Sequence, residues 1–241
     1  MSEDTPARRA LFTRRWDSNA APATGIWAER RRLASAMRLV IERLTTSDAP
    51  EEELRVAAER LEEYAEHLAS HPRRDRYEGF AETAVAELEE RETSASGGGH
   101  FDYSPLIGRS NPLSPPIEMR AEEDRVIAEV AFGSAYEGPP GCVHGGYVAA
   151  AFDEVLGYAQ SLSGRPGMTG TLKVIYRTPT PLHTPLVFEA WIDGTEGRKL
   201  FVKGTLHAGE RLCAECEGIF ISMKPNAFRK LLDERAGREP R

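Results

Sequence analysis

The spacing of hydrophobic residues changes near residue 100 of this 241-residue chain. In the first hundred residues they recur at intervals of three and four, which is typical of amphipathic helices. The pattern predicts two helices joined near Pro50. Their apolar positions are Ile26, Leu33, Met37, Val40, Ile41 and Leu44 in the first helix and Leu54, Ala57, Ala58, Leu61, Tyr64, Ala65 and Leu68 in the second. A third helical stretch is expected over residues 80–90.

The first two predicted helices differ in charge. Residues 29–43 contain five arginines and two glutamates, whereas residues 48–70 contain eight acids and two arginines. Opposite charges attract, so we expect the two helices to pair as an antiparallel hairpin with complementary rims. A Ser- and Gly-rich run follows at residues 93–99. The chain is therefore expected to divide into a helical N-terminal region (1–92), a flexible or extended linker (93–111), a main domain (112–225) and a C-terminal helix and tail (226–241).

From residue 117 onwards apolar residues alternate with polar ones, which is the period of a β-strand with one buried face. Strands are expected over residues 125–132, 171–177, 185–193, 199–207 and 211–223. One convincing helix interrupts them, from about residue 145 to 160. A long helix among antiparallel strands predicts an α+β fold in which the helix packs on one face of the sheet.

Composition and charge narrow the class of protein. The chain has 40% hydrophobic and 29% charged residues, as soluble globular proteins do, and a formal net charge of −7. That charge argues against a nucleic-acid partner, since such proteins set clustered cations against phosphates. The longest uncharged apolar stretch is shorter than the roughly 20 residues of a membrane helix, so no membrane partner is expected. Three cysteines do not make a disulfide framework, which favours a reducing cytoplasm.

The start of the embedded helix is the first candidate for chemistry. His144, Gly145 and Gly146 open it, and the two glycines leave the first backbone N–H groups uncovered. These groups have no partner within the helix, and the helix dipole adds positive charge there, so they can bind an anion or a developing oxyanion. We therefore include Gly146 among the substrate-binding residues. His144 is better explained as a cap or loop-fixing residue than as an acid–base group.

An acid within the same helix is the second candidate. Asp153 stands among apolar residues, where a carboxylate is costly to desolvate unless it has a partner or a task. At 1.5 Å per residue, the eight steps from Gly145 to Asp153 separate them by roughly 12 Å. One helix cannot supply both to one reacting carbonyl, which predicts a two-fold dimer with two equivalent sites at its interface. Glu154 points about 100° away around the helix and is expected to be solvated or salt-bridged.

Several motifs together resemble a known family. They are His144-Gly145-Gly146 with an acid nine positions after the histidine, the run from Met168 to Pro179, and Glu196-Gly197-Arg198-Lys199. In order and spacing they are similar to the hotdog-fold acyl-CoA thioesterases of the PaaI-like and thioesterase-superfamily-member-4-like type, over about residues 112–225. The resemblance implies a six-stranded antiparallel sheet curled around the central helix. It also implies a homodimer or dimer of dimers that hydrolyses acyl-CoA to free acid and CoA, with no metal or redox cofactor.

The resemblance also implies roles for single residues. The amide of Gly145 would hold the thioester oxygen, and Asp153 of the neighbouring subunit would activate water or attack directly. Thr169 would orient that water or carboxylate, although Thr171 also fits a strand start and the choice between them stays open. Apart from the resemblance, Arg198 and Lys199 follow a glycine turn and are candidates for binding the phosphates of CoA, and a solvent-facing turn explains them equally well.

Other readings of the sequence are less favoured. Cys142 lies two residues before His144, but nothing nearby in the sequence activates it as a nucleophile. Cys213 and Cys216 stand in a predicted strand, where residues three apart face opposite sides, so a structural role is favoured over zinc or redox chemistry. The main alternative function is a non-catalytic hotdog module that binds acyl-CoA as a sensor. A hydratase would need a different arrangement of Asp and His, and the pattern does not reveal the acyl group.

Overall fold

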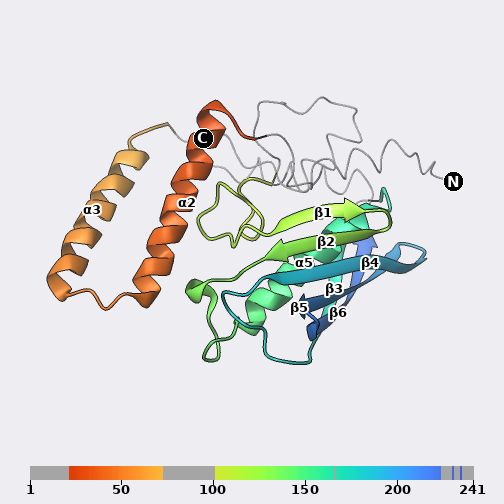
Figure 1. The fold of residues 1–241 in the computed structure, drawn as a ribbon. Helices are drawn as coiled ribbons and strands as arrows, with labels where there is room; N and C mark the ends of the chain where they lie inside the picture. Colours follow the sequence, from red (N-terminus) through yellow and green to blue (C-terminus); the bar gives the residue numbers. More distant parts are fainter. Residues whose placement is uncertain (1–21, 73–100, 166, 224–229, 231–233, 235–241) are drawn as a thin grey trace.

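The computed structural model describes residues 22–72, 101–165, 167–223, 230 and 234. Within these residues the alternating stretches form a six-stranded antiparallel sheet in the order β1-β2-β4-β5-β6-β3. The strands are β1 (Glu118–Glu122), β2 (Arg125–Val130), β3 (Gly167–Tyr176), β4 (Leu186–Glu196), β5 (Lys199–Ala208) and β6 (Arg211–Ser222). The sheet curls around the helix α5 (Gly145–Ser161), as Figure 1 shows. This arrangement confirms the expected α+β fold of the hotdog type, with N-terminal helices beside it.

Helix α5 packs against the sheet because most of its side chains are apolar. Its buried residues are Val148, Ala151, Phe152, Val155, Leu156, Tyr158, Ala159, Gln160 and Ser161. The rings of Phe152 and Phe188 meet edge to face, with centroids 5.0 Å apart. Two glycines let the helix approach the strands closely, since a Cβ on Gly204 or Gly218 would come within 2.8 or 2.9 Å of a Leu156 methyl group. The core of the molecule therefore lies between α5 and the sheet.

The sequence pattern does not predict strand β1. This strand pairs with β2 from Glu118↔Glu129 to Glu122↔Arg125, at one edge of the sheet. Four of its five residues are polar or small, and only Met119, which is 2% exposed, belongs to the core. A short edge strand can be held by backbone pairing with one neighbour, so it needs little of the alternation that reveals central strands.

The chain before β1 is a compact turn segment. Part of it, residues 101–111, falls in the predicted linker 93–111, and there the chain forms successive turns rather than an extended segment. Asp102 and Ser104 are 5% and 1% exposed, and the Ser110 N–H donates to the Asp102 carbonyl at 2.8 Å. Polar side chains hide the packing from a hydrophobicity pattern, because here they are buried with hydrogen bonds rather than solvated. The domain boundaries themselves stay a prediction.

Helix α2 (Gly25–Thr46) packs on this segment through a polar face. Arg31 makes an ion pair with Asp102, and Arg38 donates to the carbonyl of Asn111 at 2.9 Å. Near the end of α2, the Glu42 carboxylate accepts the N–H groups of Ser134 and Ala135. By contrast, the large apolar residues predicted as its buried stripe are mostly exposed, namely Ile26, Leu33, Met37, Val40 and Leu44. The face that contacts the body was therefore not the one indicated by hydrophobic spacing.

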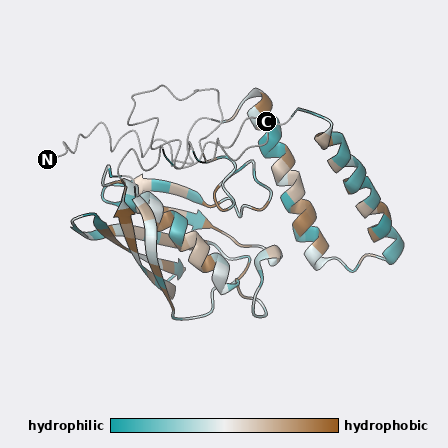
Figure 2. Cartoon of the chain, turned by 180° about the vertical axis from the view of Figure 1, so that it is seen from behind, coloured by the Kyte–Doolittle hydropathy of each residue, from teal (hydrophilic) through white to brown (hydrophobic). Residues whose placement is uncertain are grey.

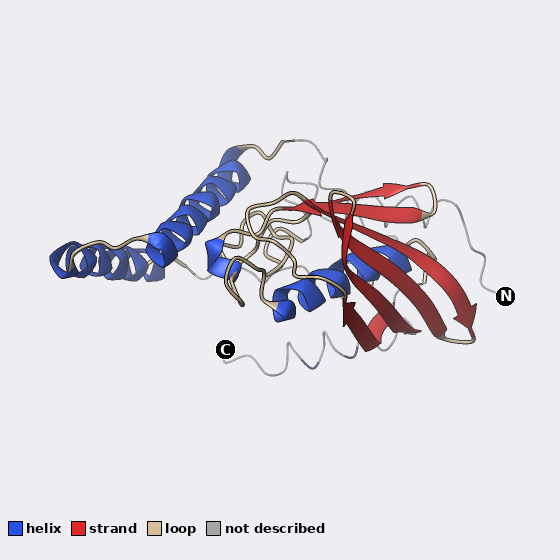
Figure 3. Ribbon diagram, turned by 60° about the horizontal axis from the view of Figure 1, so that its bottom comes forward, coloured by secondary structure: helices blue, strands red, loops and turns tan. Residues whose placement is uncertain are grey.

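Helix α3 (Glu51–Ala69) stands apart from the sheet, and none of its residues is buried. Figure 3 shows α2 and α3 extending from one side of the molecule, and Figure 2 shows that α3 is mostly hydrophilic. The two helices run antiparallel in Figure 1, but among the described residues no ion pair joins α2 to α3, so the expected contact between complementary rims is not formed. The reason is that α2 uses Arg31 and Arg38 to hold residues 101–111 instead of the acids of α3.

Three expectations concern chain outside the described residues. They are the helical stretch over 80–90, the Ser- and Gly-rich part of the linker up to residue 100, and nearly all of the C-terminal helix and tail over 226–241. Within the described residues, no helix is both long enough and apolar enough to cross a membrane.

Candidate active site

The beginning of α5 is fixed by a histidine cap. His144 has extended backbone angles, φ −60° and ψ 130°, and its Nδ1 accepts the N–H of Gly146 at 3.0 Å. The imidazole thus uses Nδ1 as an acceptor toward the helix and leaves Nε2 on its other side. The histidine thus performs the capping role that the sequence indicates, and it holds the first turn of the helix in place.

The cap leaves one backbone amide free. The Gly146 N–H is bound to His144, and the N–H groups of Tyr147 and Val148 bond to the His144 carbonyl. Within the described part of the chain, no acceptor faces the N–H of Gly145. An uncovered N–H at a helix N-terminus is suited to an oxyanion. The Gly146 amide is occupied by the cap, and the expected role of Gly146 in substrate binding stays a prediction.

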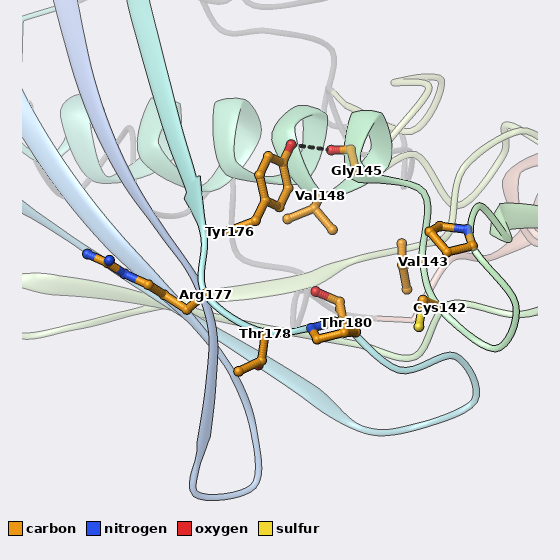
Figure 4. Close-up of a pocket in the computed structure, with 10 residues that line it drawn as sticks. Cys142, Val143, Gly145, Val148, Tyr176, Arg177, Thr178 and Thr180 are labelled. Carbon is orange, nitrogen blue, oxygen red and sulfur yellow. Dashed lines mark hydrogen bonds between the residues drawn. The ribbon is translucent and has the colours of Figure 1, made fainter.

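Figure 4 shows the pocket beside this amide. The Tyr176 hydroxyl donates to the Gly145 carbonyl at 2.7 Å and so ties β3 to the helix start. A Cβ on Gly145 would stand 3.3 Å from the Tyr176 oxygen, so a side chain here would crowd the tyrosine. The pocket has a volume of about 380 Å³ and is lined by Pro139, Cys142, Val143, Gly145, Val148, Tyr176, Arg177, Thr178, Pro179 and Thr180.

Asp153 lies in a second pocket, further along α5. This pocket has a volume of about 370 Å³ and is lined by Asp153, Glu154, Gly157, Gly167, Met168, Thr169 and Phe220. The Thr169 hydroxyl donates to Oδ1 of Asp153 at 2.8 Å. This hydrogen bond fixes the orientation of the carboxylate, which suits a base or a nucleophile.

A bulge in β3 explains why Thr169 rather than Thr171 meets Asp153. Leu172 and Val174 face the side of the sheet that carries the helix. Thr169 is three positions before Leu172, so strict alternation would place it on the opposite face. The register of β3 with β6 shifts between Thr169 and Thr171, so Gly170 is the extra residue of a bulge. The bulge reverses the alternation and brings Thr169 to the helix side.

The two candidate pockets are separate within one chain. They share no lining residue, and the eight helical steps between Gly145 and Asp153 correspond to about 12 Å along the axis. One copy of the chain therefore presents an oxyanion-binding amide at one place and an oriented carboxylate at another.

Comparison with known proteins shows which family this fold belongs to. The family model of the thioesterase superfamily matches residues 140–215. This range includes helix α5, along which both pockets lie, and Thr169. A crystal structure of a thioesterase superfamily protein has 30% sequence identity and a TM-score of 0.69, and the match covers 83% of this chain and 97% of that chain. The chain belongs to the thioesterase superfamily.

Curated members of the thioesterase superfamily match a shorter part of the chain. Bovine (Bos taurus) acyl-coenzyme A thioesterase THEM4 is 33% identical over 106 residues, which is 43% of this chain and 44% of that protein. Human (Homo sapiens) acyl-coenzyme A thioesterase THEM5 is 30% identical over 94 residues, which is 38% of each chain. The chain thus spans less than half of the length of these superfamily relatives.

Glu154 corrects the sequence-based expectation for this thioesterase-superfamily site. It is not freely solvated: it is half-buried in the Asp153 pocket, and burial together with the nearby charge of Asp153 raises its pKa to about 7, opposed by a hydrogen bond from Ser104. It is not salt-bridged either, since no cation within the described residues pairs with it. The Ser104 hydroxyl lies 3.3 Å from its Oε1. Sequence spacing misses this because residues 101–117, not α5 itself, cover Glu154.

Arg198 and Lys199 lie at the turn between β4 and β5. The Arg198 side chain donates from Nε to the Ser222 carbonyl at 3.0 Å, which anchors it to the end of β6. Lys199 pairs with Ile221, and Ile221 pairs with Met168 of the Asp153 pocket. The two cations therefore lie near the Asp153 end of the sheet rather than the Gly145 end, and their expected contact with CoA phosphates stays a prediction.

The three cysteines of this superfamily member are free thiols. Cys142 lines the Gly145 pocket, but Nδ1 of His144 is turned to Gly146, so it is not poised to accept a proton from the Cys142 thiol. Cys213 and Cys216 are buried, and burial raises the pKa of Cys216 to about 12. A buried thiol that keeps its proton acts as a small apolar side chain, in line with the structural role expected for this pair.

Proposed function

We propose that this protein is a thioester hydrolase that converts an acyl-CoA to the free acid and CoA. The single observation that carries the proposal is Asp153, an acid of the central helix, which is held by Thr169 at the wall of a pocket. The proposal is further supported by the free amide of Gly145 at the helix N-terminus, because acyl transfer needs a donor for the developing oxyanion. The relatives THEM4 and THEM5 are named acyl-coenzyme A thioesterases, which agrees with this proposal.

We infer that each site combines two copies of the chain. The Gly145 amide and Asp153 are about 12 Å apart on one helix, so the amide must serve the Asp153 of a second copy. Strand β3 lies at the end of the sheet, and within the described residues only β6 pairs with it. Its exposed Met168 and Tyr176 leave apolar surface at that edge. Pairing of two copies along β3 would set two α5 helices antiparallel and create two equivalent sites.

The chemistry follows from these groups. The Gly145 N–H of one copy would bind the thioester oxygen, and its dipole would stabilise the negative charge that develops there. Asp153 of the other copy would either take a proton from a water that attacks the carbonyl carbon or attack that carbon itself. The carbon–sulfur bond then breaks and CoA leaves as its thiolate. These steps use neither a metal nor a redox cofactor.

The function is tested by release of free thiol from a panel of acyl-CoA esters. Asp153→Asn should lower kcat by at least about 100-fold, since general-base catalysis is typically worth that much or more. A matched control is Asp193→Asn, which removes an acid that pairs with Lys203 on the sheet surface. Full activity of Asp153→Asn would remove Asp153 from the mechanism. Tight binding of acyl-CoA without turnover by the unaltered protein would instead favour the sensor function.

The composite site is tested by mixing two inactive variants. Gly145→Pro removes the N–H at the first helical position, where proline fits the backbone, and His144 already has the extended angles that precede a proline. The added Cβ requires the Tyr176 ring to move by only a few tenths of an ångström. Mixed with Asp153→Asn chains in equal amounts, half of the dimers combine both, and one of their two sites is intact. Activity should therefore recover to about a quarter of normal. No recovery after verified subunit exchange would contradict the shared site.

A further inference from the structure

A tight turn separates helix α2 from the Asp153 pocket. The turn, residues 101–110, is closed by hydrogen bonds from the Ser104 N–H to the Phe101 carbonyl at 2.9 Å and from the Gly108 N–H to the Ser104 carbonyl at 3.0 Å. Gly108 is required by this closure, since a Cβ there would stand 2.5 Å from the backbone of Ser104. The turn is therefore a defined structural unit and not a loose connection.

Helix α2 holds the turn from one side. The Arg31 Nε lies 3.1 and 3.0 Å from the two carboxylate oxygens of Asp102, and one of its terminal nitrogens lies 2.9 Å from Oδ1. Asp102 is 5% exposed and also accepts the Ser110 hydroxyl at 3.0 Å. The ring of Trp27 contacts that of Tyr103, with centroids 5.9 Å apart. Breaking such a buried pair leaves an uncompensated charge, so the turn depends on Arg31.

The same turn contacts the pocket from its other side. Ser104 is 1% exposed, and its hydroxyl oxygen accepts the N–H groups of Leu106 and Ile107 at 3.3 Å each. With its acceptor positions used in this way, its own proton is directed to Oε1 of Glu154, 3.3 Å away. Glu154 stands next to Asp153 in the pocket wall. A continuous set of contacts thus runs from α2 to the site.

We propose that helix α2 is a structural part of the Asp153 pocket: the Arg31–Asp102 pair keeps the 101–110 turn closed, and Ser104 of that turn positions Glu154 in the pocket wall. The proposal rests on the function proposed above, since it concerns the same site. Arg31, Asp102 and Ser104 are positioning residues, because none of them lines the pocket. It assigns a task to the first helix of the N-terminal region, which the fold of the sheet domain alone does not explain.

The closed turn controls how Glu154 titrates. The groups that face it are Asp153 from α5 and Ser104 from the turn, and the strand residues of the pocket, Met168, Thr169 and Phe220, carry no charge. Exclusion of water and the negative charge of Asp153 both favour a proton on Glu154. The pocket then holds one negative charge instead of two in the range around neutral pH, which favours an anionic ester as ligand.

The test compares two neighbouring arginines of α2. Arg31→Met removes the ion pair to the turn, whereas Arg32→Met is a matched control, since Arg32 pairs with Glu29 of its own helix and is 78% exposed. The titration of Glu154 is followed in the full chain by ¹³C NMR of the glutamate carboxyl carbons, assigned by its loss in Glu154→Gln. In Arg31→Met the turn should open to water, and the Glu154 midpoint should fall by about one pH unit or more. Arg32→Met should leave it unchanged.

A second variant gives a shift of opposite sign. Ser104→Ala removes the hydrogen bond that favours the charged form while the turn stays closed, so the Glu154 midpoint should rise. We also expect kcat/KM for an acyl-CoA to fall about tenfold in Arg31→Met and to stay within about twofold in Arg32→Met, because a loosened wall misplaces the site. An unchanged Glu154 midpoint in a folded Arg31→Met protein, or a fall in Ser104→Ala, would overturn the proposal. The titration needs no turnover, so it remains decisive even where no ester is hydrolysed.

Discussion

Replacing Glu154 by glutamine should stabilise the protein at alkaline pH much more than at acid pH. In the folded protein the pKa of Glu154 is raised to about 7 by burial and by the charge of Asp153, whereas the ordinary value is 4.5. The difference of about 2.5 pH units corresponds to about 3 kcal/mol at 1.36 kcal/mol per unit. Because the folded state binds this proton more tightly, its stability falls as pH rises from about 4.5 to 7 and stays lower above that range.

Glutamine has no proton to lose and can still accept the hydrogen bond from Ser104, so the variant should lack this fall in stability. Urea unfolding at pH 5 and at pH 8, at one fixed protein concentration, measures the free energy of unfolding for both proteins. The advantage of Glu154→Gln should be about 2–3 kcal/mol larger at pH 8 than at pH 5. Comparing two proteins at each pH cancels the other titrating groups.

A control and a clear refutation are available for this experiment. Glu210→Gln changes an exposed acid in the turn between β5 and β6. The difference in free energy of unfolding between this variant and the unaltered protein should be similar at pH 5 and pH 8. If Glu154→Gln has the same stability difference at both pH values, the carboxyl is not kept protonated by its surroundings. The reasoning from burial and from the neighbouring Asp153 would then be wrong.

Three further substitutions, one of them with a matched control, test the site and the core. Thr169→Val removes the hydrogen bond to Asp153, and we expect kcat to fall about tenfold with little change in KM, measured by thiol release. Gly204→Ala places a Cβ 2.8 Å from a core methyl group and 2.9 Å from a carbonyl oxygen, and should destabilise by about 1–3 kcal/mol in urea. Gly194→Ala, with open space around it, should change stability far less in the same assay. Cys142→Ser should keep nearly full thioesterase activity. Loss of activity in this variant would indicate that the Cys142 thiol is the nucleophile.

Much of the fold could be predicted from sequence because its signals are local. Alternation of apolar residues indicated five of the strands, and the unbroken apolar run after His144 indicated α5. The paired glycines at the start of that run, with a histidine before them, also predicted the helix start and its cap, since capping involves neighbours within three residues. Such features need no knowledge of distant parts of the chain.

Other features depended on contacts between residues far apart in sequence. Strand β1 is held at the sheet edge by backbone pairing with β2, and the turn 101–110 buries Asp102, Ser104 and Ser110 because hydrogen bonds satisfy their polar groups. Helix α2 presents Arg31 and Arg38 to the body, while hydrophobic spacing indicated a different face. Charge pointed to the acids of α3 as partners of these arginines, but their partners are in residues 102–111, because attraction between charges does not specify an orientation or a path of the chain.

The site shows the same division most clearly. The sequence by itself determined that Asp153 and the Gly145 amide are separated along one helix, because helical rise is a local constant. It left Thr169 and Thr171 equivalent and treated Glu154 as a surface acid. Only the tertiary structure decided which threonine meets Asp153 and what surrounds Glu154. The bulge at Gly170 arises from pairing with β6. The burial of Glu154 arises from a turn some fifty residues earlier in the chain. A residue's periodicity depends on its neighbours in sequence, whereas its solvation and its partners depend on what packs over it.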